Sequence, residues 1–278
     1  MARRILEYFE YDDQGSTTFF TPGHIDGGSF DVDGGLDWET HMGGIPTEDN
    51  QLVAPGGSVS FLPTTATFLA KCLRASWTSS LQALHLRCGT SSEAYNHQNA
   101  KCSRLRLEGR VGQRLSATVD WMAITPGNIA VPSWNAHHSG NPFHWHQGVC
   151  TFNSAALSMQ DFSLEVNNNL QPYSSLDSKS AASQRHADEI IPHNETVTVS
   201  TTVHVPPGSN LNINWGDAPA DHVASLVFTS VTPTTLTIAL ANLRLKSWKQ
   251  GLVRSDGVVP WTLDYVGKPN TANTVAIS

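Results

Sequence analysis

The sequence predicts a mainly β protein built from two packed β-sheets, with one short helix and long arms and loops. Several segments alternate apolar and polar residues with a period of two, which is typical of half-buried strands. Glycine-containing turns separate many of these segments, and only residues 61–77 show a helical pattern. A chain of 278 residues can therefore form one large β domain or two smaller ones.

Composition indicates a folded protein with few charges. Apolar residues make up 39% of the chain, and charged residues make up only 15%. Ordinary domains carry about 25% charged residues, so the low value suits a protein that buries much of its surface in contacts. No stretch approaches the ~18 apolar residues of a membrane helix. The four cysteines are too few and too scattered for a disulfide framework.

The first fifty residues differ from the rest in charge. Residues 1–50 contain 11 Asp and Glu against Arg3 and Arg4, whereas residues 51–278 contain 13 acidic and 15 basic residues. With its repeated glycine turns, this segment predicts an acidic N-terminal arm with little core of its own. Because the chain becomes acidic where a signal peptide would be apolar, we expect synthesis in a cytoplasm.

One short α-helix is predicted near residues 63–75. Pro63 followed by two threonines can start a helix. Apolar residues at helical spacing then form one stripe. The stripe consists of Phe68, Leu69, Cys72 and Leu73.

Strands are expected through most of the remaining chain. Residues 102–112 and 114–124 alternate in period two, and the Gly-Gln pair between them predicts a hairpin. Residues 195–205 form the most regular alternating segment. Within residues 234–248 the apolar positions change phase, which predicts a β-bulge near Ala241.

The segment MQDFSLEVNNNL, residues 159–170, predicts a half-buried strand. Its apolar side holds Phe162, Leu164 and Val166. Its polar side holds Asp161, Ser163, Glu165 and Asn167. In a monomer this polar side would face water, whereas in an assembly it would meet another copy of the chain.

A weak internal similarity suggests two related halves. AKCSRLRLEG followed by LSATVDWMA resembles ALSMQDFSLEV followed by VTVSTTVHV. The Pro- and Asn-rich connector at 125–142 is the best boundary. We therefore expect one unit over 1–278, with possible β-sandwich halves at about 1–136 and 137–278.

The order of the motifs resembles that of the major tail tube proteins of long-tailed, siphovirus-like bacteriophages. The similar motifs are KCSRLRLEG with LSATVDW, then PFHWHQGVCTF, then DFSLEVNNNL and finally LTIALANLRL. The similarity covers roughly residues 57–250 and depends on the order and spacing of the motifs.

The resemblance implies a structural virion protein and not an enzyme. Such proteins form a tail-tube-type β-sandwich and join edge to edge into rings, whose inner sheets make one β-barrel. Stacked rings form the conduit for DNA ejection. Rings are usually hexameric, and three duplicated chains would supply the same six units. The implied partners are other copies, tape measure and terminator proteins, and DNA passing through the lumen. No membrane contact and no cofactor are expected.

Charge suggests a hypothesis for the contacts between copies. The acidic arm is expected to reach an adjacent subunit or ring and pair with basic strand residues, so that deleting residues 2–14 would block tube growth and leave folded monomer. The candidate inter-subunit residues are Arg104, Arg106, Arg110, Arg114, Asp12, Asp13 and Glu165. Direct nucleic-acid binding by the arginines is the alternative interpretation.

Other functions remain open at this level. His144 and His146 would share one face of a strand and could bind a metal, although a polar connector explains the His-rich segment 137–146 equally simply. A terminator or distal tail protein that forms a single ring is one alternative function. A β-sandwich carbohydrate-binding or adhesin module is another. The sequence lacks the nucleophile-elbow, zinc-protease and phosphate-loop motifs, so no catalytic residue is proposed.

Overall fold

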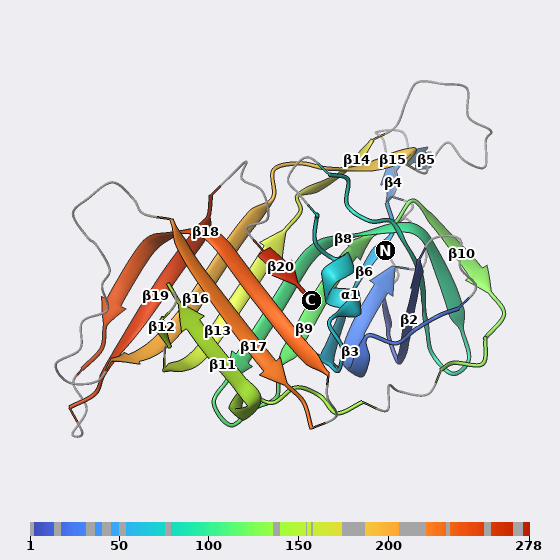
Figure 1. The fold of residues 1–278 in the computed structure, drawn as a ribbon. Helices are drawn as coiled ribbons and strands as arrows, with labels where there is room; N and C mark the ends of the chain where they lie inside the picture. The colour runs from blue at the N-terminus through green and yellow to red at the C-terminus, as the bar shows by residue number, and fades with distance from the viewer. Residues whose placement is uncertain are drawn as a thin grey trace.

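The fold is mainly β, as the sequence predicts. The computed structural model describes residues 3–13, 18–31, 37–40, 46–49, 54–75, 79–135, 140–153, 155–156, 158–173, 187–205, 221–231, 234–252, 257–268 and 275–278. These residues form a large antiparallel sheet, two small hairpins and short helical segments (Figure 1).

The first half of the chain contains ten strands and one helix in the described residues. They are β1 (Arg3–Ile5), β2 (Tyr8–Asp13), β3 (Gly23–Asp31), β4 (Asp37–Thr40), β5 (Pro46–Asp49), β6 (Gly56–Pro63), α1 (Thr67–Lys71), β7 (Leu84–Gly89), β8 (Ala94–Arg110), β9 (Ser116–Met122) and β10 (Thr125–Ile129).

The second half contains ten more strands and one 3₁₀-helix in the described residues. They are η1 (Trp145–Gln147), β11 (Gly148–Phe152), β12 (Ala155–Ala156), β13 (Met159–Asn167), β14 (Leu170–Tyr173), β15 (Glu189–Pro192), β16 (Thr196–Val205), β17 (His222–Thr229), β18 (Thr235–Gln250), β19 (Val259–Gly267) and β20 (Val275–Ile277).

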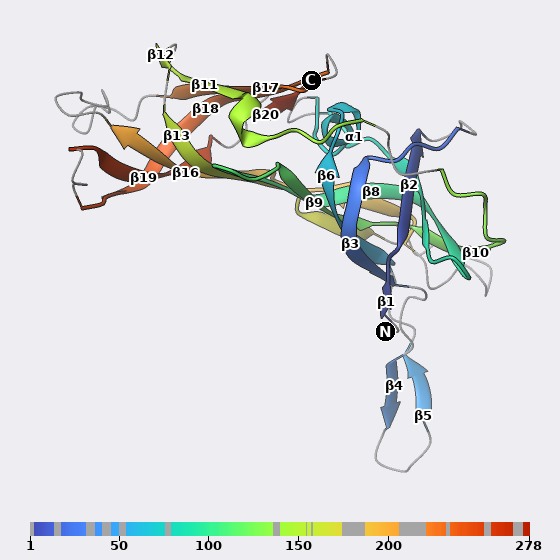
Figure 2. The same ribbon diagram turned by 90° about the horizontal axis from the view of Figure 1, so that it is seen from below.

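Eight strands form one continuous antiparallel layer in the order β3-β6-β9-β8-β13-β16-β19-β18, which we call the eight-strand layer. A second layer packs on it. In the first half this second layer consists of β2, β7, β10 and the beginning of β8, and in the second half of β11, β17, β20 and the beginning of β18. Figure 2 shows β11, β17 and β20 stacked on one side of β13, β16 and β19.

The long strands β8 and β18 belong to both layers, and each contains an asparagine where it passes from one layer to the other. Asn99 and Asn242 both have a φ of 54°. Asparagine is one of the few L-residues that adopts this left-handed conformation readily. The β17–β18 register shifts at the same place, so the bulge predicted near Ala241 is confirmed.

The two halves have the same topology. Strands β2, β3, β6, β7, β8, β9 and β10 correspond in order and pairing to β11, β13, β16, β17, β18, β19 and β20, and the hairpin β4–β5 corresponds to β14–β15. We call these sets the N-terminal and C-terminal units. Each unit contributes four strands to the eight-strand layer, and β8 of the first unit pairs with β13 of the second.

The irregularities of the ladders recur at corresponding places. One extra residue interrupts β3 at Asp26, and one interrupts β13 at Gln160. One extra residue likewise interrupts β8 at Ser103, and one interrupts β18 at Lys246. Because bulges re-aim a strand and are specific features of a fold, these matches align the two units residue by residue.

The internal similarity seen in the sequence matched the wrong strands. It compared β8 and β9 with β13 and β16, whereas the topology makes β8 and β9 correspond to β18 and β19. The reason is that period-two alternation is common to all half-buried strands and carries no information on pairing. The correspondence is visible only from the bulges and the shared bends.

Aromatic residues fill the space between the two layers in both units. In the N-terminal unit the rings of Phe9 and Trp121 lie 5.2 Å apart, and Phe30 packs against Tyr95. In the C-terminal unit Phe152 lies 5.5 Å from Tyr265. One cluster of buried side chains runs through both units. Such contacts add about 0.5–1.5 kcal/mol per pair beyond area burial.

The predicted acidic arm is wrong for most of its described residues. Strand β2 pairs with β7, and β3 pairs with β6. Phe9, Tyr11 and Phe30 are buried in the core. The apolar residues between the charges therefore anchor this segment in the core, and among its described residues only the hairpin β4–β5 projects from the body (Figure 2). Deleting residues 2–14 would remove a core strand, so unfolding is expected instead of a selective loss of tube growth.

The predicted helix is shorter than expected. Helix α1 spans Thr67–Lys71, and its N-cap, Ala66, provides no side-chain hydrogen bond. Pro63 is the last residue of strand β6, which pairs with β3 on one side and with β9 on the other. The strand therefore extends through the residue where the helix was predicted to begin. The predicted apolar stripe is confirmed as buried and consists of Phe68, Leu69, Cys72 and Leu73.

Replacing Asn242 with alanine should lower the free energy of unfolding by about 1–2 kcal/mol, because alanine pays the full cost of the left-handed conformation. Replacing it with glycine should cost less. Urea denaturation measures both, with the exposed Asn128→Ala in β10 as the control, for which a change within about 0.5 kcal/mol is expected. An equal loss for alanine and glycine would contradict the role assigned to backbone conformation.

Candidate functional site

Alternate residues of the eight-strand layer face away from the second layer and form a polar face. Strand β13 shows the pattern that the sequence predicts. Its buried residues are Phe162, Leu164 and Val166, and its partly exposed residues are Asp161, Ser163, Glu165 and Asn167. The same alternation continues in β8 and β9 on one side and in β16 and β19 on the other.

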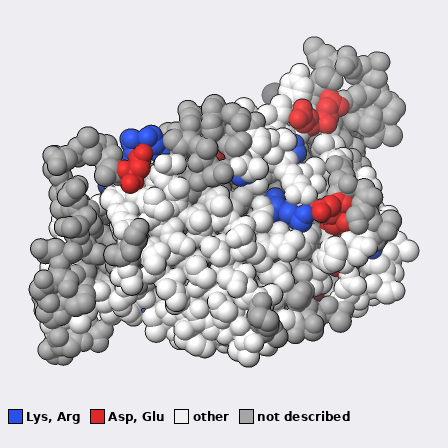
Figure 3. All heavy atoms as spheres, viewed as in Figure 1, with Lys and Arg blue, Asp and Glu red and all other residues white. Residues whose placement is uncertain are grey.

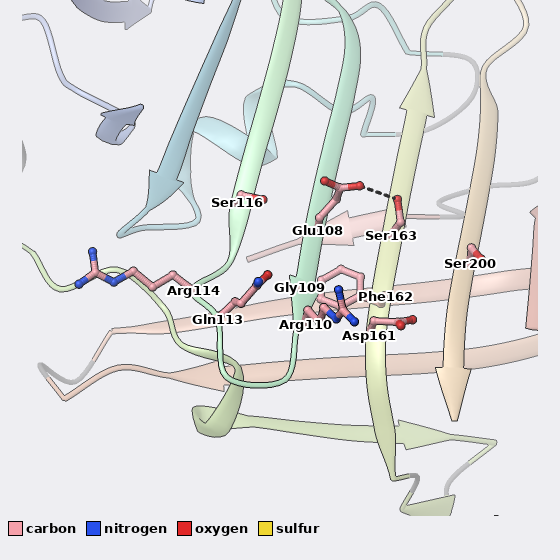
Figure 4. Close-up of a pocket in the computed structure, with 10 residues that line it drawn as sticks. All are labelled: Glu108, Gly109, Arg110, Gln113, Arg114, Ser116, Asp161, Phe162, Ser163 and Ser200. Atoms are coloured by element: carbon pink, nitrogen blue, oxygen red, sulfur yellow. Dashed lines mark hydrogen bonds between the residues drawn. The ribbon is translucent and has the colours of Figure 1, made fainter. Parts of the chain in front are cut away.

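Charges of opposite sign neutralise one another on this polar face. Arg104 Nη2 lies 2.7 Å from Asp120 Oδ2, and Arg106 Nη2 lies 2.6 Å from Glu108 Oε1. Ser163 donates a hydrogen bond to the same Glu108 oxygen (Figure 4). A surface with such alternating signs lacks the continuous positive stripe that binds successive phosphates tightly.

Asp264 is held in place by two serines from neighbouring strands. Ser200 Oγ on β16 donates to Oδ1 at 2.7 Å, and Ser247 Oγ on β18 donates to Oδ2 at 2.6 Å. These hydrogen bonds favour the carboxylate and lower the pKa of Asp264 below its ordinary value. Three strands are therefore linked across the polar face by one side chain.

A shallow pocket of about 290 Å³ lies on the polar face where β8 meets β13. Arg110 and Asp161, which are opposite each other in the ladder, lie together at one end of it (Figure 4). Arg114 extends away from this pair. Residues of both units line the pocket.

The predicted inter-subunit residues divide into two groups. Arg104, Arg106 and Arg110 lie on β8 beside Glu165 on β13, with Arg106 directly opposite Glu165. Arg114 lies beyond the β8–β9 turn, in a bridge with His144. The two units of one chain therefore place these four arginines around the joint between them.

Asp12 and Asp13 lie elsewhere, on β2. The Asp12 side chain is 0% exposed, opposite His85 of β7, so the proposal that it contacts another subunit is wrong. Asp13 is more exposed, but it accepts hydrogen bonds from Lys71 and Gln82 within the same chain. Burial of β2 against β7 is the physical reason for Asp12, whereas Asp13 is bound by partners from its own chain.

The two histidines proposed as metal ligands do not share a strand. His144 is the N-cap of η1, and His146 lies within that 3₁₀-helix, so the predicted strand is wrong here. Their rings are nevertheless close, with centroids 5.3 Å apart. In the described part of the chain, no group of three or more His, Cys, Asp or Glu could hold a metal ion. The neighbouring residues 137 and 138 lie outside the described residues.

The joint between β8 and β13 is the structural feature that sequence reasoning missed. Seven directly opposed pairs, from Arg110–Asp161 to Arg104–Asn167, connect the two units, and we call this ladder the internal joint. On the core side its residues Leu105, Leu107, Leu164 and Val166 are fully buried. The alternation of both strands was visible in the sequence, but their pairing with each other was not.

The outer face of the C-terminal unit has a different character. Strands β11, β17 and β20 and the first half of β18 contain no Asp, Glu, Lys or Arg, and Figure 3 shows an almost uncharged surface over them. Val149, Val223 and Val231 are exposed there. The C-terminal unit therefore has a polar face that carries charges and an outer face that is nearly uncharged.

No protein-family model matches the chain, and no curated protein is similar to it in sequence. Among the described residues, no helix has the length and apolar character needed to span a membrane.

Replacing Gly109 with alanine should destabilise the internal joint. A Cβ there would lie 2.7 Å from Leu115 Cδ2 and 2.7 Å from Phe162 Cε1. Overpacking of this kind costs about 1–3 kcal/mol. The matched control is Gly127→Ala in β10, where the nearest contacts would be at 3.9 Å. Thermal or urea unfolding checks the difference, and equal stability of the two variants would contradict the tight packing.

Asp264→Asn should lower stability at neutral pH more than at acid pH. The folded pKa of Asp264 lies below its unfolded value, so the carboxylate stabilises the fold above about pH 4 and loses this contribution as the pH falls through the folded pKa. Urea midpoints of both proteins at pH 7, 5 and 3 measure the effect. A difference that stays constant or grows toward pH 3 would show that ionisation of Asp264 is not involved.

Proposed function

We propose that this chain is a structural virion protein, the major tail tube subunit of a long-tailed bacteriophage, whose rings stack into the conduit for DNA delivery. The observation that carries the proposal is the internal joint. Two units of the same topology lie side by side in one sheet, with β8 of the first unit paired to β13 of the second.

A joint of this kind can be repeated between one unit and the next. It is head to tail, because it uses different strands of the two units, and head-to-tail contacts produce rings when the rotation closes. Closing a sheet into a barrel leaves no strand edge exposed. The same contact that joins two units within the chain is therefore suited to join chains.

The arrangement favours three chains in each ring. Each chain supplies two units and eight strands of the layer, so three chains give the six units that are usual in tail tube rings. Rotation about the axis of a ring does not move any part along that axis, so corresponding parts of the two units should lie at the same end of the axis. The hairpins β4–β5 and β14–β15 both lie at the same end of the molecule (Figure 1), which agrees with such a rotation.

The polar face suits the wall of a DNA conduit. Its arginines are paired with or placed opposite acidic residues, and DNA would slide along such a wall because few free positive charges are available to bind phosphates. The projecting hairpin β4–β5 is suited to contact another subunit, and the nearly uncharged outer face of the C-terminal unit is available to other tail proteins. The working site is therefore a surface of the assembly, with no catalytic residue.

Electron microscopy of concentrated protein tests the proposal. We expect hollow rings or tubes, and native mass spectrometry should give masses in multiples of three chains. A single ring that never stacks would favour a terminator or distal tail protein. A monomer at every concentration that binds sugars would favour the carbohydrate-binding alternative and overturn the proposal. Rings of six chains would reject the threefold count but retain the tube function.

A further inference from the structure

We infer that β18 of one copy pairs with β3 of the next copy in the register of the internal joint, and that it displaces β1 from β3. This inference rests on the proposed ring assembly and names the strands, the register and the residues that close the ring.

The recurring bulges define the register. Counting from the extra residues Ser103 in β8 and Lys246 in β18, Arg106 corresponds to Lys249. Counting from Asp26 in β3 and Gln160 in β13 in the same way, Asp31 corresponds to Glu165. The internal pair Arg106–Glu165 therefore becomes the pair Lys249–Asp31 between two chains.

This register keeps opposite charges together. In the internal joint, Arg106 on β8 is opposite Glu165 on β13. In the proposed joint, Lys249 on β18 would be opposite Asp31 on β3, so both joints place a basic residue opposite an acidic one. Like charges directly opposite one another destabilise an antiparallel pair, and opposite charges stabilise it by roughly 0.2–1 kcal/mol. Charge complementarity in a register obtained from bulges alone supports a second copy of this chain as the partner.

Strand β1 occupies the place that the neighbour would take. Arg3 is opposite Asp31, and Ile5 is opposite Ser29, in an antiparallel ladder of three pairs. In the proposed joint, Lys249 and Gly251 would take these two positions, and β18 would run in the same direction as β1. A short segment near the chain terminus therefore covers this edge of an isolated chain, as edge strands require.

The second half of β18, which among the described residues pairs with β19 alone, exposes apolar side chains whose counterparts are buried. Trp248 is 40% exposed, whereas the corresponding Leu105 is 0% exposed. Leu252 is 91% exposed, and its counterpart, Gly109, is buried in the internal joint. A neighbouring unit covers the β8 positions, and a neighbouring chain would cover the β18 positions in the same way.

Disulfide trapping tests the register. In Asp31→Cys/Lys249→Cys, oxidation should produce covalently linked dimers and closed trimers that a reductant separates. The native thiols should contribute little background, because Cys72, Cys88 and Cys102 are buried and burial raises the pKa of the Cys150 thiol to about 11.

Two control pairs accompany the test. Arg106→Cys/Glu165→Cys should form a bond within the chain, because these residues are already opposite each other. Asp31→Cys/Gln250→Cys should give few linked chains, because one step along a strand places the side chain on the other face. Efficient linking of this shifted pair would overturn the register.

The outcomes separate this inference from the proposed function. Rings or tubes without a Lys249–Asp31 cross-link would overturn the joint and leave the tube proposal standing. Linked chains that never form rings would support the joint and overturn the tube proposal. Unlinked monomers under all conditions, with the internal control pair bonded, would overturn both.

A deletion tests the displacement of β1. Removing residues 2–5 takes away β1 but retains Leu6, which is buried in the core. The deletion should increase the rate of association several-fold, measured by light scattering or sedimentation, without changing the unfolding midpoint of the monomer by more than a small amount. An unchanged or slower rate would show that β1 does not compete with β18.

Discussion

The rest of the structure depends on one constraint, which is that the backbone groups of every strand need partners. The eight-strand layer meets this requirement for its interior strands by antiparallel pairing across both units. At the two ends it is met only in part. Strand β1 covers a short stretch of β3, and in the described residues the second half of β18 pairs on one side only, with β19. In the described residues, the backbone at these two ends of the layer is therefore only partly paired.

The long strands β8 and β18 connect the two layers of each unit, because each pairs with strands of both layers. Each strand begins in the outer layer and ends in the eight-strand layer, and β8 there pairs with β13 of the other unit. The left-handed asparagines at their bends are required at the same point in both units. Packing, bending and joining are consequently properties of the same residues, and a change in the bend would also change the joint.

Much of the fold was predictable from local patterns. The alternation in β13, the hairpin between β8 and β9 and the bulge near Ala241 follow from residue spacing and turn residues, and the structure confirms all three. The acidic arm and the histidine strand were wrong for a common reason. A charge count and a spacing rule both describe single segments, whereas burial of Phe9 and the turn at His144 are set by neighbouring strands.

The sequence by itself determined the fold class, because the period of its apolar residues depends only on the geometry of a strand. It also determined which face of each strand would be polar. Only the tertiary structure decided which strands pair when they are far apart in the chain, because alternation does not encode such pairing. The correspondence of the two units, the internal joint and the position of β1 on β3 all follow from pairing, and for that reason they emerge only from the folded chain.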